Sequence, residues 1–302
     1  MKGRDLLMSK AKKRRTFLTA AAFILPFFIL YTVFTIWPVI QGFYVSLHKW
    51  GLMGKQDFIG FDNYVKFIGD KNFWKALKAT TFFVIITTPM LVILAMILAM
   101  LANRVTKMKK SLRIIYYLPS VLSVSVASFV AKYVFTPYRG LVNGVLHATG
   151  MLSASEEPQW LQDPNLVWIT ISVMTVWWTI GFSMLLYLSA LQDISFDIYE
   201  AAMIDGASSK QQLFYITVPL LKPTIWLVSL LQLIACFKVF GQIQLITGGG
   251  PGSTTRPLIQ YIYETAFGKN NMGYAAAMSY VLFAILLVLS IVQQALQKRG
   301  DD

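Results

Sequence analysis

Six long apolar runs constrain the fold of this chain more than any other feature of its sequence. Four runs contain no charged residue, and each of the other two contains a single lysine, Lys132 or Lys238. A helix needs about 20 apolar residues to cross the ~30 Å hydrocarbon core of a bilayer. Each run therefore predicts one membrane-spanning helix, and the chain is predicted to be an all-α integral membrane protein with six transmembrane helices. The runs cover residues 17–40, 79–102, 114–134, 166–191, 224–246 and 272–296.

Charged residues are scarce and lie mainly between the apolar runs. They make up 14% of the 302 residues, against 56% for hydrophobic residues, whereas a soluble domain carries about 25% charged residues. The net charge of +13 would also suit nucleic-acid binding. However, basic residues beside apolar runs are typical of membrane orientation and of contact with anionic lipid. We therefore expect membrane lipid, and no nucleic acid, among the partners.

Two basic segments predict the orientation in the membrane. Residues 1–16 carry seven lysines and arginines, and the short loop from Arg104 to Arg113 carries five. Basic residues in short loops stay in the cytoplasm. Six spans then place both termini there, as a basic tail at residues 1–16 and a second tail at residues 297–302. The first run is too long for the apolar region of a cleaved signal peptide, so we interpret it as a span.

The sequence carries no pattern that is typical of an enzyme. Cys236 is the single cysteine, and the two histidines, His48 and His147, are isolated, so no metal site or catalytic triad is predicted. A glycine cluster at residues 248–252 precedes Ser253, whereas a phosphate-binding loop needs a lysine there. We expect no cofactor and no nucleotide site in this chain.

The polar segment between the fourth and fifth runs is predicted to fold as a bent pair of helices. Asp197 and Glu200 form a D-x-x-E helix start, a variant of the capping box. Gly206 can adopt the left-handed conformation that ends a helix. Ser208 and Ser209, followed by two glutamines, restart a helix, and two prolines then stop or redirect it. These prolines are Pro219 and Pro223.

The same segment resembles a known signature. Its Glu-Ala-Ala triplet, Gly206, Ile216 and Pro219 fall in the register of the cytoplasmic loop of importer-type ABC permeases, although Val218 replaces the usual leucine. Other segments resemble the sugar-type permeases of binding-protein-dependent ABC transporters, such as those for maltose and glycerol phosphate. They are Phe58 to Tyr64, the TGGGP stretch of residues 247–251, Tyr261 to Tyr263, Ala266-Phe267 and Gly273 to Ala275.

The resemblance implies an ABC importer type I permease fold. Residues 41–76 would form an external loop and residues 77–296 the transmembrane core, with a coupling loop at residues 192–223. It also implies a second permease subunit, two ATP-binding subunits and an extracytoplasmic solute-binding protein, at a bacterial-type inner membrane. Closure of the ATPase pair would act through the coupling loop to open the solute pathway by alternating access. The implied coupling residues are Glu200, Ala201, Ala202, Asp205, Gly206, Ile216 and Pro219.

Polar residues inside the apolar runs are candidates for the solute pathway, because such groups usually face a cavity or a partner. Gln232 shares a helical face with Cys236 and Val239, and Lys238 and Gln242 form an i, i+4 pair on another face. Trp177 or Trp178 could stack on a sugar ring. The structural alternatives are an interhelical hydrogen bond for Gln232, packing against helices or lipid for the tryptophans, and subunit pairing for Lys238.

Two other classes of function compete with a transport subunit. A stand-alone secondary transporter of a small polar solute is typically built from inverted repeats or intramembrane carboxylates, and no Asp or Glu lies inside the six runs. A membrane enzyme would need a polar catalytic cluster near a span end, and none is visible. The solute itself stays open among monosaccharides, disaccharides, oligosaccharides and glycerol phosphate.

Overall fold

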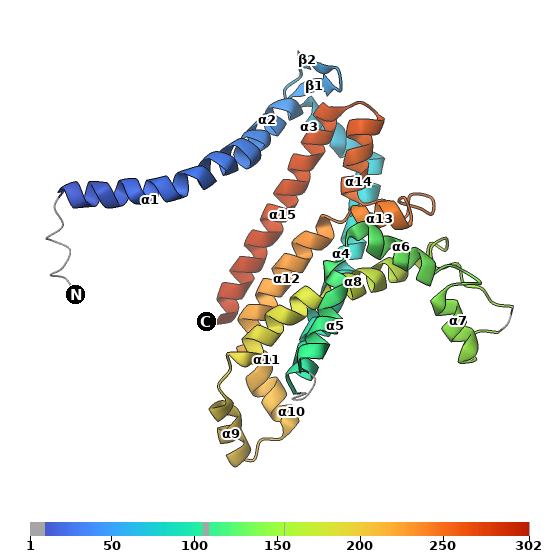
Figure 1. Ribbon diagram of the computed structural model, residues 1–302. Helices are drawn as coiled ribbons and strands as arrows, with labels where there is room; N and C mark the ends of the chain where they lie inside the picture. Colours follow the sequence, from blue (N-terminus) through green and yellow to red (C-terminus); the bar gives the residue numbers. More distant parts are fainter. Residues whose placement is uncertain (1–9, 105–108, 154, 302) are drawn as a thin grey trace. The chain divides into compact units, whose positions relative to one another are not determined.

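In the computed structural model the described residues form helices joined by loops, with one short β-hairpin (Figure 1). The structure describes residues 10–104, 109–153 and 155–301. The first nine residues of the predicted basic tail, Lys107 of the basic loop and the last residue of the second tail therefore lie outside the described residues. The chain divides into two compact units, and each is described by itself. One unit is Met1–Ile68 with Thr265–Tyr280, and the other is Gly69–Glu264 with Val281–Asp302.

The first unit is built on one long apolar helix and a small hairpin. The helix comprises α1 (Lys10–Tyr31), the π-helical turn η2 (Thr32–Ile36) and α2 (Trp37–Ser46). Strands β1 (His48–Gly51) and β2 (Gly54–Phe58) then pair antiparallel and lead into α3 (Asp62–Gly69). Asn63 is buried and its side-chain amide donates to the carbonyls of Ser46 and His48, which fastens α3 to the hairpin. The sequence did not predict these two strands. The π-helical turn η4 (Glu264–Gly268) and α15 (Met272–Asp301) each contain residues of both units.

The second unit is organised around α4 and α8. These two helices pack along each other, and both carry fully buried side chains such as Phe83, Leu91 and Met184. The Phe83 and Trp168 ring centroids are 6.2 Å apart, and the buried hydroxyl groups of Thr87 and Ser172 are 2.9 Å apart. Helices α5, α12 and α14 pack around this pair. In chain order the helical elements are α4 (Lys71–Arg104), α5 (Lys109–Val121), α6 (Val124–Val134), α7 (Leu141–Ala148), α8 (Val167–Gln192), α9 (Phe196–Ile204), α10 (Ser209–Gln212), η3 (Leu213–Thr217), α11 (Val218–Leu220), α12 (Lys222–Phe237), α13 (Gly241–Ile246) and α14 (Leu258–Tyr263).

Each of the six apolar runs is helical, but two of them are broken. Among the described residues, four continuous helices are long and apolar enough to cross a membrane, and the number rises to six if each bent pair is one span. The third run bends by 100° between α5 and α6, where the hydroxyl of Ser123 accepts from the backbone N–H of Val126 and caps α6. The second bent pair joins Ser209–Leu220 to Lys222–Phe237, so it contains only the first part of the fifth run. After Phe237 that run is interrupted, and it restarts in a short helix at Gly241. In contrast, α4 continues through Pro89 without a break.

A carboxylate organises the segment between α6 and α8. Glu157 accepts hydrogen bonds from the backbone N–H of Tyr138 at 2.8 Å and from the amide of Asn143 at 2.6 Å, and its other oxygen lies 3.1 Å from His147 Nε2. Asn143 in turn accepts from the indole N–H of Trp160 at 2.5 Å. Glu157 therefore ties α7 to the chain on both sides of it. The hydrogen bond from Tyr138 is the main cause that lowers the pKa of Glu157 below its usual 4.5.

We expect acid to loosen this segment. Because the pKa of Glu157 is lower in the folded chain, its contribution to stability is complete above about pH 4.5 and is lost as the pH falls through the folded pKa. Amide hydrogen exchange at Tyr138 should accelerate as the pH falls below about 4.5, beyond the intrinsic change with pH. Glu157→Gln should show fast exchange already at pH 7. Glu156→Gln is the matched control: the Glu156 carboxylate accepts hydrogen bonds from the backbone N–H and the hydroxyl of Ser153, whereas Tyr138 bonds Glu157, so Tyr138 should stay protected. Equal protection of Tyr138 in both variants would contradict this role.

Candidate functional site

The first candidate site is the helical hairpin between α8 and α12, at the lower end of the second unit in Figure 1. Its first helix, α9, begins at Ser195, whose hydroxyl accepts from the backbone N–H of Asp197 at 3.3 Å. The predicted start at Asp197 is therefore two residues late, and Asp197 instead lies in the first turn, where a carboxylate is favourable. Gly206 ends the helix at φ +80°, as predicted. The N–H of Ala207 bonds the carbonyl of Ala202, which closes the last turn.

The second arm of the hairpin restarts where the sequence predicted. The hydroxyl of Ser208 accepts from the N–H of Gln211, and the Gln211 side chain accepts from the N–H of Ser208, so the capping box is confirmed. Helix α10 continues through the π-helical turn η3 into α11, and the chain then bends by 62° into α12. Pro223 lies in the first turn of α12, where a missing N–H costs nothing. Pro219 instead follows directly on the π-helical turn η3.

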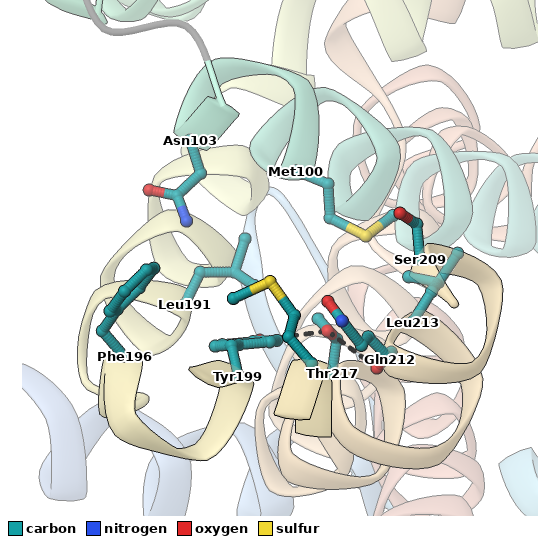
Figure 2. A pocket seen from close by; sticks show the side chains of 10 residues that line it. Met100, Asn103, Leu191, Phe196, Tyr199, Ser209, Gln212, Leu213 and Thr217 are labelled. Atoms are coloured by element: carbon teal, nitrogen blue, oxygen red, sulfur yellow. Dashed lines mark hydrogen bonds between the residues drawn. The ribbon is translucent and has the colours of Figure 1, made fainter. Parts of the chain in front are cut away.

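The two arms enclose a cavity and are joined by polar contacts. The Tyr199 and Thr217 hydroxyl groups are 3.0 Å apart, and the amide of Gln212 donates to the carbonyl of Ala207 at 3.1 Å. The cavity has a volume of about 480 Å³, and Met100 and Asn103 from the end of α4 close it on one side (Figure 2). The hairpin thus shares a cavity with the end of α4 and leads directly into α12.

Helix α9 has two different sides. Phe196, Tyr199 and Met203 line the cavity, whereas Glu200 and Ala201 are exposed on the rest of the helix surface. Ile204, at the end of the same helix, is 86% exposed. We call Glu200, Ala201 and Ile204 the outer side of α9. The small side chain of Ala201 leaves room for another backbone to approach this side of α9 closely.

The structure brings most of the implied coupling residues to the surface of this hairpin. Ala202 and Ile216 are half-buried, and the others are exposed; these are Glu200, Ala201, Asp205, Gly206 and Pro219. The sequence analysis did not include Ile204 in the site, although its place three residues after Ala201 on a predicted helix was a usable signal.

The second candidate site is a cavity between α5, α8 and α12. It has a volume of about 320 Å³ and brings together two of the predicted pathway residues, Trp178 and Gln232. The Trp178 indole donates to the carbonyl of Leu122 at 3.1 Å, at the break between α5 and α6. The Gln232 amide donates to the Ser183 hydroxyl at 2.7 Å, which is the interhelical bond of the structural alternative. The Ser120 hydroxyl in the same wall has no hydrogen-bond partner among the described residues.

The other predicted pathway residues lie elsewhere. Trp177 lines an apolar cavity between α6 and α8, with Val130 and Val173. Lys238 is exposed at the C-terminus of α12, and Gln242 lies half-buried in α13. The expected i, i+4 pair of Lys238 and Gln242 was wrong, because the helix is interrupted between them. Cys236 and Val239 are buried.

The two breaks in the transmembrane helices lie close to each other. A Cβ atom on Gly241, at the start of α13, would lie 3.2 Å from Val124 at the start of α6. Broken helices inside a membrane are typical of transporters, because irregular backbone is tolerated where it lines a cavity. Among the described residues, no group of three His, Cys, Asp or Glu side chains is placed to hold a metal ion.

Comparison with known proteins gives one consistent result. Residues 67–301 match the family model of the binding-protein-dependent transport system inner membrane component. The lactose transport system permease protein LacF of Rhizobium radiobacter is 35% identical over 90% of this chain and 91% of its own length. The sulfoquinovosyl glycerol transport system permease protein SmoG of Agrobacterium fabrum is 32% identical over 94% of this chain and 92% of its own length.

A solved structure of the same kind shares the fold. It belongs to a bacterial ABC transporter involved in the import of the acidic polysaccharide alginate, and the matching chain superposes with a TM-score of 0.80 at 26% identity. The match covers 96% of this chain and 98% of that chain. A second structure shows a bacterial alginate ABC transporter in complex with a periplasmic protein that carries an alginate pentasaccharide, again with a TM-score of 0.80 and 25% identity.

Proposed function

The chain belongs to the family of binding-protein-dependent transport system inner membrane components, and we propose that it is the permease subunit of an ATP-driven importer for a sugar or a related polar solute. The observation that carries this proposal is the outer side of α9, an exposed surface of Glu200, Ala201 and Ile204 on a hairpin fixed to the transmembrane helices. The sugar class is supported by the names of the relatives, which include permeases for lactose and for sulfoquinovosyl glycerol.

In the proposed mechanism the hairpin is the coupling element. The outer side of α9 contacts an ATP-binding subunit, and its motion passes through the Tyr199–Thr217 contact to η3 and so to α12. In this proposal the ATP-binding subunits hold the nucleotide, and the energy of hydrolysis reaches this chain as displacement of the hairpin. The implied coupling residues Asp205, Gly206, Ile216 and Pro219 belong to the same hairpin and hold its shape.

We further propose that the cavity at Trp178 and Gln232 is part of the solute pathway. An indole presents a flat apolar face to a sugar ring, and the Gln232 amide and Ser120 hydroxyl supply hydrogen-bonding groups in the same wall. The cavity lies next to the α5–α6 break, where a change in helix angle would open or close it. Trp177, Lys238 and Gln242 remain candidates that lie outside this cavity.

The proposed assembly follows from the same family. The chain pairs with a second permease subunit, two ATP-binding subunits and an extracytoplasmic solute-binding protein. Residues 1–16 and 297–302 are cytoplasmic, residues 41–76 form an external loop, and residues 77–296 form the transmembrane core, with the coupling loop at residues 192–223. The complex lies in a bacterial-type inner membrane.

Reconstitution tests the proposal directly. Vesicles that contain the complete complex and its binding protein should accumulate labelled solute only when ATP is supplied on the side of the ATPase. Vesicles that contain this chain alone should accumulate none. Uptake by the single chain without ATP would overturn the proposal and favour a stand-alone secondary transporter.

Gln232→Leu is expected to weaken transport more than assembly. Loss of one hydrogen bond to solute in a dry site corresponds to about a tenfold rise in the KM of uptake. Ser183→Ala is the matched control, because it removes the interhelical bond but keeps the amide in the cavity. KM should rise for Gln232→Leu only. An equal loss in both variants would show that Gln232 acts by joining α8 and α12.

A further inference from the structure

An open groove follows the N-terminal part of α4 in the second unit, beside the start of α8. It has a volume of about 720 Å³ and is lined by residues 74–85 of α4, by Trp168 of α8 and by Thr254 of the glycine-rich loop. The Phe82 and Trp168 rings lie against each other in its wall, with their centroids 5.6 Å apart. Both helices begin beside the groove, so the groove lies where the charged ends of two predicted spans give way to their apolar residues.

The sequence places this groove at a boundary between charged and uncharged residues. On α4, Lys75 and Lys78 line the groove, and no charged residue follows until Arg104. On α8, no charged residue occurs between Asp163 and Asp193. A bilayer that covers the uncharged parts of both helices therefore places Lys75 and Lys78 at the level of the lipid headgroups. Trp74, half exposed beside them, has the amphipathic ring that is enriched at this depth.

The charges that line the groove have one sign. Among the described residues that line it, two are lysines and none is acidic. The ammonium of Lys75 donates to the carbonyl of Gly252 at 3.1 Å. A lysine has three N–H donors, so two more remain for an anion. The pair Lys75 and Lys78 thus presents positive charge and free donors at the open end of the groove.

The other end of the groove is apolar and accessible. Phe82 is 48% exposed and Ile85 is 64% exposed, and both lie further along α4 toward the middle of the span. Their positions continue the groove into the layer that lipid chains occupy. Cationic donors followed by an exposed apolar track match the order of groups in a phospholipid, from phosphate to acyl chain.

From this arrangement we propose that the groove binds an anionic phospholipid. The phosphate lies against Lys75 and Lys78, the glycerol region against Trp74, and an acyl chain against Phe82 and Ile85. The bond from Lys75 to Gly252 also places the headgroup beside the glycine-rich loop, so that the lipid helps to hold this loop on α4. The site does not depend on the transport cycle, and it can be tested without a known solute.

The test measures lipid binding to the purified complete complex by native mass spectrometry. Phosphatidylglycerol and phosphatidylcholine are titrated separately against the wild type, Lys75→Gln, Lys78→Gln and the double variant. Lys71→Gln is the matched control, because Lys71 is exposed at the start of the same helix but does not line the groove. A lysine near an anionic lipid corresponds to about a fivefold change in affinity, so the double variant should bind phosphatidylglycerol about 30-fold more weakly.

Three results would overturn the proposal. They are equal phosphatidylglycerol affinity in the double variant and Lys71→Gln, equal affinity of the wild type for phosphatidylcholine, and efficient photocrosslinking from position 78 to the second permease subunit. The last result would show that a protein covers the groove. Because none of these measurements uses uptake, their failure would leave the proposed transport function standing.

Discussion

Ala201→Trp is expected to abolish ATP-driven uptake while the chain still folds and inserts. Ala201 is exposed on the outer side of α9, so the larger side chain meets no neighbour within this chain and should change the free energy of unfolding by less than about 0.5 kcal/mol. In the proposed complex, however, Ala201 lies at the centre of a close contact, between Glu200 and Ile204. An indole there would hold the two proteins apart.

The size of the effect follows from interface energetics. Disrupting the centre of a protein interface typically costs 2–4 kcal/mol, which is about 30-fold to 1,000-fold in affinity. We expect the ATP-binding subunit to be lost during purification and uptake in vesicles to fall by at least 30-fold. Glu200→Lys should have a smaller effect, because an exposed charge contributes less than a central apolar contact.

Ala148→Trp is the matched control for this experiment. Ala148 is also an exposed alanine near the end of a short helix, in α7, outside the hairpin. It should retain the ATP-binding subunit. Uptake at wild-type level in Ala201→Trp, or equal loss in both variants, would contradict the coupling role of α9.

The fold of the hairpin and the family of the chain could largely be predicted, because the sequence patterns that indicate them involve residues close together in the chain. The capping box of Ser208 and Gln211 and the left-handed Gly206 are confirmed, since each depends on residues within one helical turn. The apolar runs depend only on length and composition, and they predicted where helices occur. The resemblance based on the Glu200–Pro219 pattern is confirmed by the family match over residues 67–301.

The breaks and the cavities could not be predicted because they depend on distant residues. The third run contains neither glycine nor a charged residue at Leu122 and Ser123, so its sequence does not mark a break there. Contacts such as the bond from the Trp178 indole to Leu122, 56 residues apart, hold the interruption. The Gln232–Ser183 bond likewise joins two helices. The expected i, i+4 pair of Lys238 and Gln242 was wrong because it assumed one continuous helix across residues 238–242.

The crossing of α5 and α8 allows the second large prediction. Gly181 lies inside α8 where the α5 backbone comes closest, and a Cβ atom there would lie 2.4 Å from the carbonyl oxygen of Tyr116 and 2.7 Å from the Cα atom of Tyr117. These are backbone atoms, so the clash cannot be relieved by a side-chain rotation. The two helices would have to separate.

Gly181→Ala should therefore destabilise the chain, even though alanine is the better helix former. Overpacking of this kind costs about 1–3 kcal/mol, against a gain of about 0.5–1 kcal/mol from helix propensity. The apparent Tm of the purified complex should fall. Tyr117 on α5 and Trp178 on α8 belong to opposite walls of one cavity, so separation of the helices should also raise the KM of uptake.

Gly144→Ala is the matched control, and it is expected to change stability in the opposite direction. Gly144 lies inside α7, and a Cβ atom there would meet nothing within 4 Å. The same substitution should stabilise α7 by about 0.5–1 kcal/mol, because only the helix propensity changes. A local measurement, hydrogen exchange of the α7 amides, detects this gain in a large complex. An unchanged apparent Tm and KM in Gly181→Ala would show that α5 and α8 do not approach each other this closely in the assembled transporter. The cavity between them would then not be a defined solute site.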